Sequence, residues 1–299
     1  MSDEIVPLEE VVPVETGAVR ARSRPRAVLG MWAYESMLAI VGAWPAAALV
    51  RAAYGRSPQG DAALWDPGAL PLLGLLTREA NGVRAAAGGV AVVLVVAAFL
   101  GLVPLAALMV SLAYASVDGG RIGAARAIEG AVRVLRPFGR LLVIVLIGQG
   151  LVLLMAVLLG EGILGWTRGG LGEARSQQAG LLVGGAVGAF ALVLAIAHDL
   201  GRAAVIRRNL QAVHALAVGT GILRRAPLSL GWAWAWRGSA SLVPVAVVGA
   251  IATSLGGRGG WALVGLAALH QGVVFVRVAL RASWLARALR AVDHFASDR

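Results

Sequence analysis

The chain has 299 residues, of which 59% are apolar, and it carries a formal net charge of +11 without any cysteine. Soluble globular chains are roughly 45–50% apolar, so this composition indicates that most of the chain lies in lipid. The absence of cysteine excludes disulfides, thiol nucleophiles and cysteine-ligated metals.

The first 26 residues have no apolar run that could form a core. They hold five acidic residues and four arginines, and we expect a disordered cytoplasmic tail over residues 1–26. An alternative is a docking peptide, because residues 5–8 and 11–14 could be held by a partner's groove or sheet edge.

Six apolar segments follow, and each is long enough to cross a bilayer, since a hydrocarbon core of about 30 Å needs about 20 helical residues. The predicted spans are residues 27–50, 83–115, 141–160, 179–197, 239–255 and 260–285. The fold class is therefore all-α, with one membrane domain over residues 27–299. The longer loop at residues 57–81 is expected to form an interfacial or re-entrant element.

All 27 basic residues are arginines. Twenty lie in residues 20–26, 121–140, 202–237 and 277–299, and the other seven lie in the alternate set of segments between the spans. The positive-inside rule then predicts that both termini lie in the cytoplasm. Because this topology explains the positive charge, nucleic-acid binding is not expected.

The alternation also predicts three hairpins whose tips point outward. Each hairpin is followed by a basic amphipathic segment, and the predicted interfacial helices cover residues 119–138, 202–220 and 281–295. An arginine-proline pattern at Pro25, Pro137 and Pro227 precedes the first, third and fifth spans. Proline is tolerated in the first turn of a helix, so each of these prolines is expected to begin one.

Two of the interfacial helices show their polarity by spacing. In residues 202–220, wound at about 100° per residue, the apolar side holds Val205, Ile206, Leu210, Val213, Leu216 and Ala217, and the polar side holds Arg207, Arg208, Gln211 and His214. In residues 119–140, the polar side holds Arg126, Glu129, Arg133, Arg136 and Arg140, and the apolar side holds Ala125, Ile128, Val132 and Leu135. Such a pattern is typical of a helix lying in the membrane interface.

Arginines on these segments are expected to bind the phosphates of anionic lipids. The predicted headgroup contacts are Arg126, Arg133, Arg136, Arg207, Arg208, Arg224 and Arg225. His198 and Asp199, with Arg202 one turn further on, are expected to form a polar cluster at the same level.

Polar residues inside the bilayer are costly, and each is a functional hypothesis. The predicted intramembrane polar residues are Glu35, Gln149, His270, Gln271 and Arg277. Glu35 and Arg277 could neutralise each other as a structural pair, or Glu35 could serve a substrate or proton path. His270 could be hydrogen-bonded to a neighbour or could be functional.

A strip of small residues on the fourth span consists of Gly180, Gly184 and Gly188. Their spacing of four creates a flat face that another helix can approach closely. We expect packing within the chain, with contact to a second copy as the alternative.

Missing residue types exclude several chemistries. Without lysine there is no phosphate-binding loop of the Gly-x-x-x-x-Gly-Lys type, no Schiff base and no Ser-Lys dyad. No second histidine stands at metal-ligand spacing on either histidine-bearing span. We therefore predict no catalytic residue, no metal site and no cofactor.

With its three outward hairpins, its basic linking segments and the entries at Pro25, Pro137 and Pro227, the chain resembles six-helix bacterial membrane proteins like the membrane domain of glycerophosphodiester phosphodiesterases and its stand-alone relatives. The resemblance covers Arg24 to about Phe295, and it carries over no phosphodiesterase activity because that catalytic domain is not present. Residues 124–131 also resemble the Glu-Ala-Ala loop of ATP-driven importers at Gly130-Ala131, although Ala124 replaces the leading glutamate.

These features and the resemblance predict a non-catalytic, lipid-interacting scaffold or membrane-complex component of a bacterial inner membrane. Its expected partners are membrane lipids, chiefly anionic ones, together with a second copy or other membrane proteins. The alternatives are a permease subunit and an intramembrane enzyme that uses Glu35 or His270.

Overall fold

The computed structural model describes residues 11–14, 19–54, 80–116, 121–168, 172–255 and 260–295. The chain is built mainly of helices, and the prediction of an all-α fold is confirmed apart from one small sheet. The helices are α1 (Pro25–Tyr54), α3 (Ala80–Leu100), α4 (Leu102–Ala113), α5 (Ala124–Arg168), α6 (Gly172–Arg208), α7 (Ala212–Arg225), α8 (Pro227–Leu255) and α9 (Trp261–His294). A short 3-10 helix, η2 (Ala21–Ser23), precedes α1.

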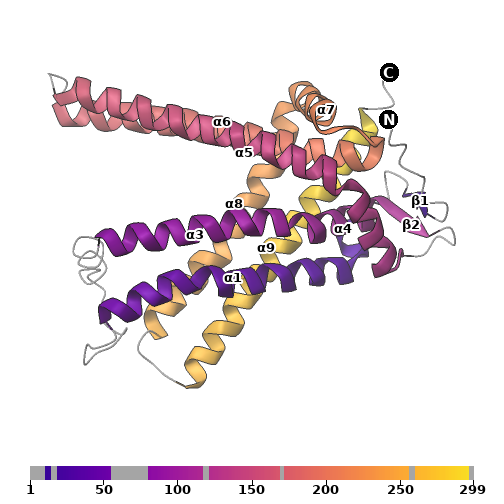
Figure 1. Ribbon diagram of the computed structural model, residues 1–299, viewed down its shortest axis with the longest axis horizontal. Coiled ribbons are helices and arrows are strands. Elements are labelled where there is room, and N and C mark those ends of the chain that lie inside the picture. Colours follow the sequence, from indigo (N-terminus) through magenta and orange to yellow (C-terminus); the bar gives the residue numbers. More distant parts are fainter. Residues whose placement is uncertain are drawn as a thin grey trace.

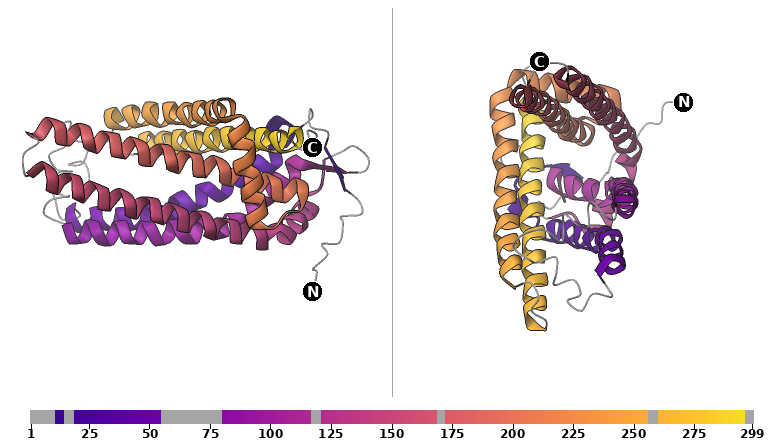
Figure 2. Two further views of the ribbon diagram at one scale, coloured as in Figure 1. Left: turned by 90° about the horizontal axis from the view of Figure 1, so that it is seen from above. Right: turned by 90° about the vertical axis from the view of Figure 1, so that its left-hand side faces the viewer.

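Six helical segments among the described residues are long and apolar enough to cross a membrane. The chain is accordingly a membrane protein. Consecutive helices contact one another in the pairs α1 with α3, α5 with α6, and α8 with α9. α9 also contacts α1, α4 and α6, and the α8–α9 pair is inclined to α1 and α3 (Figures 1 and 2).

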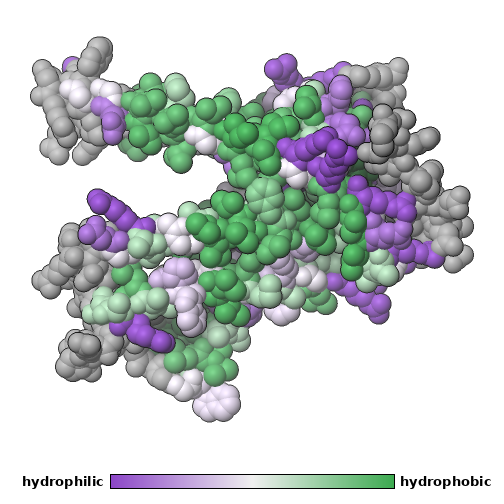
Figure 3. Space-filling model, viewed as in Figure 1, coloured by the Kyte–Doolittle hydropathy of each residue, from purple (hydrophilic) through white to green (hydrophobic). Residues whose placement is uncertain are grey.

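The described part of the chain has one packed region and one open region. The packed region, called here the basic end, comprises α4, α7, the first turns of α1 and α5 and the last turns of α6 and α9. Its largest fully buried side chains include Phe138, Leu108, Met109, Leu112, Leu141, Leu200, Leu285 and Leu289. The remainder of the six long helices, called here the far half, spreads apart, so that the α5–α6 pair stands away from α1 and α3 (Figure 3).

The predicted span 83–115 is divided into α3 and α4 at Gly101. A Cβ at this position would meet the Ala97 carbonyl oxygen at 2.9 Å and the Tyr34 ring at 3.2 Å. The Tyr34 hydroxyl donates to the same Ala97 oxygen at 2.6 Å. The absence of a side chain at Gly101 therefore leaves room for Tyr34 of α1 to pack against the break between α3 and α4.

Two predicted interfacial helices are continuous with their neighbouring spans. Residues 124–168 form the single helix α5, with Pro137 inside it rather than at its start. Residues 261–294 likewise form the single helix α9. In α5 the buried face passes through the boundary at Phe138, Leu141 and Val145, so packing continues where a break was expected. Pro25 and Pro227 do begin helices, as predicted.

The prediction of a single interfacial helix over residues 202–220 is wrong. α6 ends at Arg208, Asn209 adopts a left-handed conformation with φ of 49°, and α7 starts at Ala212. Val213, predicted on the apolar face, is 68% exposed. The buried residues of α7 are Ala212, Ala215, Gly219, Ile222 and Leu223. Three of these are alanine or glycine, and their small size permits α7 to lie directly on α6.

A two-stranded antiparallel sheet joins β1 (Val11–Pro13) to β2 (Tyr114–Ser116) at the basic end. Val11 pairs with Ser116, and the Val14 amide adds a hydrogen bond to Ala113. The prediction of a disordered tail is therefore wrong for residues 11–14, which dock on a sheet edge of their own chain. Residues 1–10 and 15–18, and most of the predicted loop element at 57–81, lie outside the described residues.

Candidate functional site

A buried ionic cluster joins α6 to α9 at the basic end. The Asp199 carboxylate accepts hydrogen bonds from Arg202 Nη1 at 3.1 Å and from Trp284 Nε1 at 2.9 Å. Asp199, Arg202 and the adjacent His198 are each less than a tenth exposed. The three residues thus form the predicted polar cluster in the protein interior, and its position at headgroup level stays a prediction. Burial makes each partner necessary, because an unpaired ion in the interior is costly.

Arg207 connects three segments that are distant in sequence. Its guanidinium donates to the carbonyl oxygens of Val14 at 3.0 Å and Ala113 at 2.9 Å, and it pairs with Asp293 at 2.9 Å. Only 6% of its side chain is exposed. The prediction that Arg207 contacts lipid phosphates is therefore corrected, since its side chain is buried and both of its Nη atoms bind groups of the protein itself.

Other arginines also bind the main chain. Arg208 donates to the Val292 carbonyl at 3.1 Å, so it is not a purely surface cation either. Arg24 donates to the Tyr114 carbonyl at 3.0 Å, and Arg290 donates to the Val19 carbonyl at 2.6 Å. The sequence analysis missed these structural roles because no spacing rule links an arginine to a carbonyl so far away in the chain.

Tyr114 reinforces the same junction. Its hydroxyl donates to the Ile206 carbonyl at 2.8 Å. Burial raises the pKa of this hydroxyl above its ordinary value, while the charge of Arg207 lowers it and that of Asp293 raises it. The hydroxyl therefore keeps the proton that it donates.

A second group of arginines is directed outward. Arg126, Arg136, Arg224 and Arg225 are exposed, and the half-exposed Arg133 pairs with Glu129 at 2.6 Å. Hydrophilic residues gather at this end of the molecule (Figure 3). The start of α5 and the last turn of α7 both lie at the basic end. Their exposed guanidinium groups can bind phosphate.

The apolar face predicted for the start of α5 is also exposed. Ile128 and Val132 are 50% and 57% exposed, whereas Ala127 and Ala131 pack into the core. The helix thus has a buried stripe and an additional open apolar stripe beside its arginines. That combination fits a helix partly immersed in the interface.

Gln271 links α1 to α9. Its side-chain oxygen accepts from Ser36 Oγ at 2.6 Å, and its carbonyl oxygen accepts from Trp32 Nε1 at 3.2 Å. Glu35 lies on the same helix as Ser36, and the charges of Arg281 and Arg277 act on its carboxyl group. Within the described chain no ion pair joins Glu35 to Arg277, so the predicted pair is replaced by a more distant attraction.

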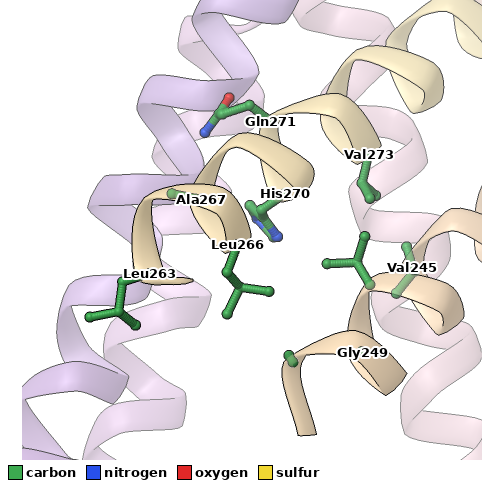
Figure 4. Close-up of a pocket in the computed structure, with 10 residues that line it drawn as sticks. Val245, Gly249, Leu263, Leu266, Ala267, His270, Gln271 and Val273 are labelled. Carbon is green, nitrogen blue, oxygen red and sulfur yellow. The ribbon is translucent and has the colours of Figure 1, made fainter. Parts of the chain in front are cut away.

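His270 lines a cavity of about 540 Å³ between α8 and α9. Its ring is directed into the space near Val245 and Val273, whereas Gln271 points away on the other side of α9 (Figure 4). The remaining lining is chiefly apolar, and the described residues contain no group of metal-binding side chains. The imidazole of His270 can donate or accept a hydrogen bond here. Gln149 lies on the exposed surface of α5.

The predicted glycine strip has no neighbour within the described chain. A Cβ added at Gly180, Gly184 or Gly188 would meet no heavy atom within 4 Å. The expectation that this strip packs inside the chain is therefore wrong, and contact with a second copy stays a prediction. The close approach occurs instead at Gly219, where a Cβ would lie 2.6 Å from the Ala197 carbonyl oxygen.

No protein-family model, curated protein or solved structure matches the chain. The resemblances drawn from its layout thus remain predictions, and the arrangement at the basic end is the basis for assigning a function.

Proposed function

We propose that this chain is a multi-pass protein of a bacterial inner membrane that acts as a lipid-interacting scaffold or component of a membrane complex. In this proposal the basic end faces the cytoplasm, and the three helix pairs are hairpins with their tips in the far half. The observation that carries the proposal is the group of exposed arginines beside open apolar surface at the basic end, including Arg136, Arg224 and Arg225.

The far half supports a lipid environment. Large apolar side chains there are widely exposed, among them Trp44, Leu94, Leu154, Leu182 and Leu242. Extended apolar surfaces of this kind mark contact with a membrane or with another protein. A bilayer around the far half places the exposed arginines at the level of the phosphates, where anionic lipids attract them.

The test is retention of anionic lipid by the protein in native mass spectrometry after extraction in mild detergent. Replacing Arg136, Arg224 and Arg225 with glutamine should lower retained phosphatidylglycerol by about fivefold for each charge removed. The matched control replaces the exposed far-half residues Arg51, Arg84 and Arg175 with glutamine and should retain the lipid. Equal retention by both variants would refute the lipid role, and a stoichiometric ATPase in the spectra would support a permease subunit instead.

Orientation can be tested separately, because the natural chain has no cysteine. Glu129→Cys places a single thiol on the exposed surface of α5 at the basic end. A membrane-impermeant maleimide should label this variant in inside-out vesicles and not in intact cells. Labelling in intact cells would place the basic end outside.

A further inference from the structure

A groove opens at the basic end between the first turns of α1, the helix α4 and the start of α5. Its volume is about 520 Å³, which lies within the range of about 300–1,000 Å³ found for small-molecule sites. α4 contacts both α1 and α5. Residues of all three helices line the groove.

The wall of the groove is apolar along most of its length. Ala27, Val103 and Ala107 line it, together with Gly30. A Cβ added at Gly30 would meet nothing within 4 Å, so the groove is open there. From Pro25 to Tyr34, both of which line the groove, α1 rises about 14 Å. This length is close to the hydrocarbon depth of one leaflet, about 15 Å.

The mouth of the groove is cationic. Arg24, Arg26 and Arg121 line it, and no carboxylate is among the described residues around the groove. Within the described chain none of the three forms an ion pair. Desolvation by burial and, after it, the neighbouring charge of Arg121 lower the pKa of Arg24. Among the described residues, like charges thus lie close together without a neutralising carboxylate.

Two helix N-termini add to this positive field. α1 begins at Pro25 and α5 begins at Ala124, and both residues line the mouth. The first amide groups of a helix lack intrahelical partners and carry partial positive charge. They favour an anion beside the three guanidinium groups.

We propose that this groove binds one anionic phospholipid from the surrounding leaflet. The phosphate lies among Arg24, Arg26 and Arg121, and one acyl chain lies along α1 and α4 toward Tyr34. Inorganic phosphate would satisfy the charges and leave the apolar wall empty, whereas a lipid without net charge would leave the mouth unneutralised. This site rests on the proposed lipid-interacting function, but it uses arginines different from those of the general membrane contact.

The test uses the full chain in phosphatidylcholine nanodiscs that contain phosphatidylglycerol with a photoreactive group on one acyl chain. After irradiation, mass spectrometry locates the labelled peptides. We expect label to concentrate on the groove-lining turns of α1 and α4. Gly30→Trp fills the open position and should abolish this label, whereas Gly150→Trp, at another glycine with nothing within 4 Å, should leave it unchanged.

A second variant tests the charges. Arg26→Gln with Arg121→Gln leaves the bond from Arg24 to Tyr114 in place and should reduce groove labelling by about fivefold for each charge. A photoreactive phosphatidylcholine probe should not respond to this change. If Gly30→Trp fails to fold, this variant decides the outcome.

The proposal is overturned if label is spread evenly over all lipid-facing helices, or if neither groove variant lowers it. Loss of retained lipid in the Arg136, Arg224, Arg225 variant with unchanged groove labelling in Gly30→Trp would overturn the groove site alone. A wild-type protein that retains no anionic lipid and takes up no label would overturn the general function as well.

Discussion

The basic end and the far half contain the same apolar residue types in opposite surroundings. Leu108, Leu200 and Leu285 are almost completely buried, whereas Leu181 and Leu182 are about three-quarters exposed. Leucine has the same hydropathy at every position, so hydropathy does not distinguish a buried leucine from an exposed one. The two regions differ in their specific contacts. The buried ion pairs, the hydrogen bonds from arginines to carbonyl oxygens and the close contact at Gly219 all lie at the basic end.

The largest expected effect separates a buried ion pair from an exposed one. Asp199→Ala should lower the free energy of unfolding by about 3–5 kcal/mol, because it leaves Arg202 buried without its counter-charge. Glu129→Ala removes the exposed partner of Arg133 and should cost at most about 0.5 kcal/mol. Thermal unfolding in mild detergent measures the stability change of each variant, and equal shifts would show that burial does not make the Asp199–Arg202 pair more important than the exposed pair.

Two glycines provide the next contrast. At Gly219 a Cβ would lie 2.6 Å from the Ala197 carbonyl oxygen and 2.8 Å from the Gly201 amide nitrogen, both of them backbone atoms. Gly219→Ala should therefore cost about 3 kcal/mol in unfolding free energy by overpacking. Gly184→Ala meets nothing within 4 Å and should be neutral or stabilising by up to about 1 kcal/mol through helix propensity. A destabilised Gly184→Ala protein would show that the glycine strip has a partner.

A smaller effect is expected for the arginine that holds the N-terminal strand. Arg207→Gln removes its charged contacts to Val14, Ala113 and Asp293 and should cost about 1.5–3 kcal/mol. Limited proteolysis should then cleave residues 11–14 faster than in the wild type. Arg225→Gln, at an exposed position, is the control and should leave the cleavage rate unchanged; equal rates in both variants would show that Arg207 does not hold the strand.

The smallest effect is expected for an apolar residue of the far half. Leu182→Ala should change the free energy of unfolding by about 0.5 kcal/mol or less, as for other surface substitutions. Leu285→Ala, in the core of the basic end, should cost about 2–5 kcal/mol. A comparable loss in Leu182→Ala would mean that another copy or another protein covers α6.

The sequence was sufficient to predict the six apolar helices, since length and hydropathy are properties of each segment alone. Pro25 and Pro227 also marked helix starts correctly. Pro137 did not, because packing on both sides of it continues the helix. Asn209, at the break between α6 and α7, was missed because the apolar spacing runs across it without interruption.

The candidate site was predictable only as a region. Arginine enrichment located the basic end, and the exposed Arg136, Arg224 and Arg225 lie there as expected. The enclosed position of Arg207 depends on carbonyl oxygens at Val14 and Ala113, far away in the chain. A helical period gives the direction of a side chain but not the partner that it meets.

The most direct test of the two-region account is the accessibility of spin labels to oxygen and to a water-soluble nickel complex in lipid nanodiscs. Single cysteines would replace Leu154, Leu182 and Leu242 in the far half and Glu129 at the basic end. The account predicts frequent oxygen collisions and few nickel collisions at the three leucine positions, with frequent nickel collisions at position 129. Frequent nickel collisions in the far half would contradict its location in lipid, and low accessibility to both reagents would show that it is covered by protein.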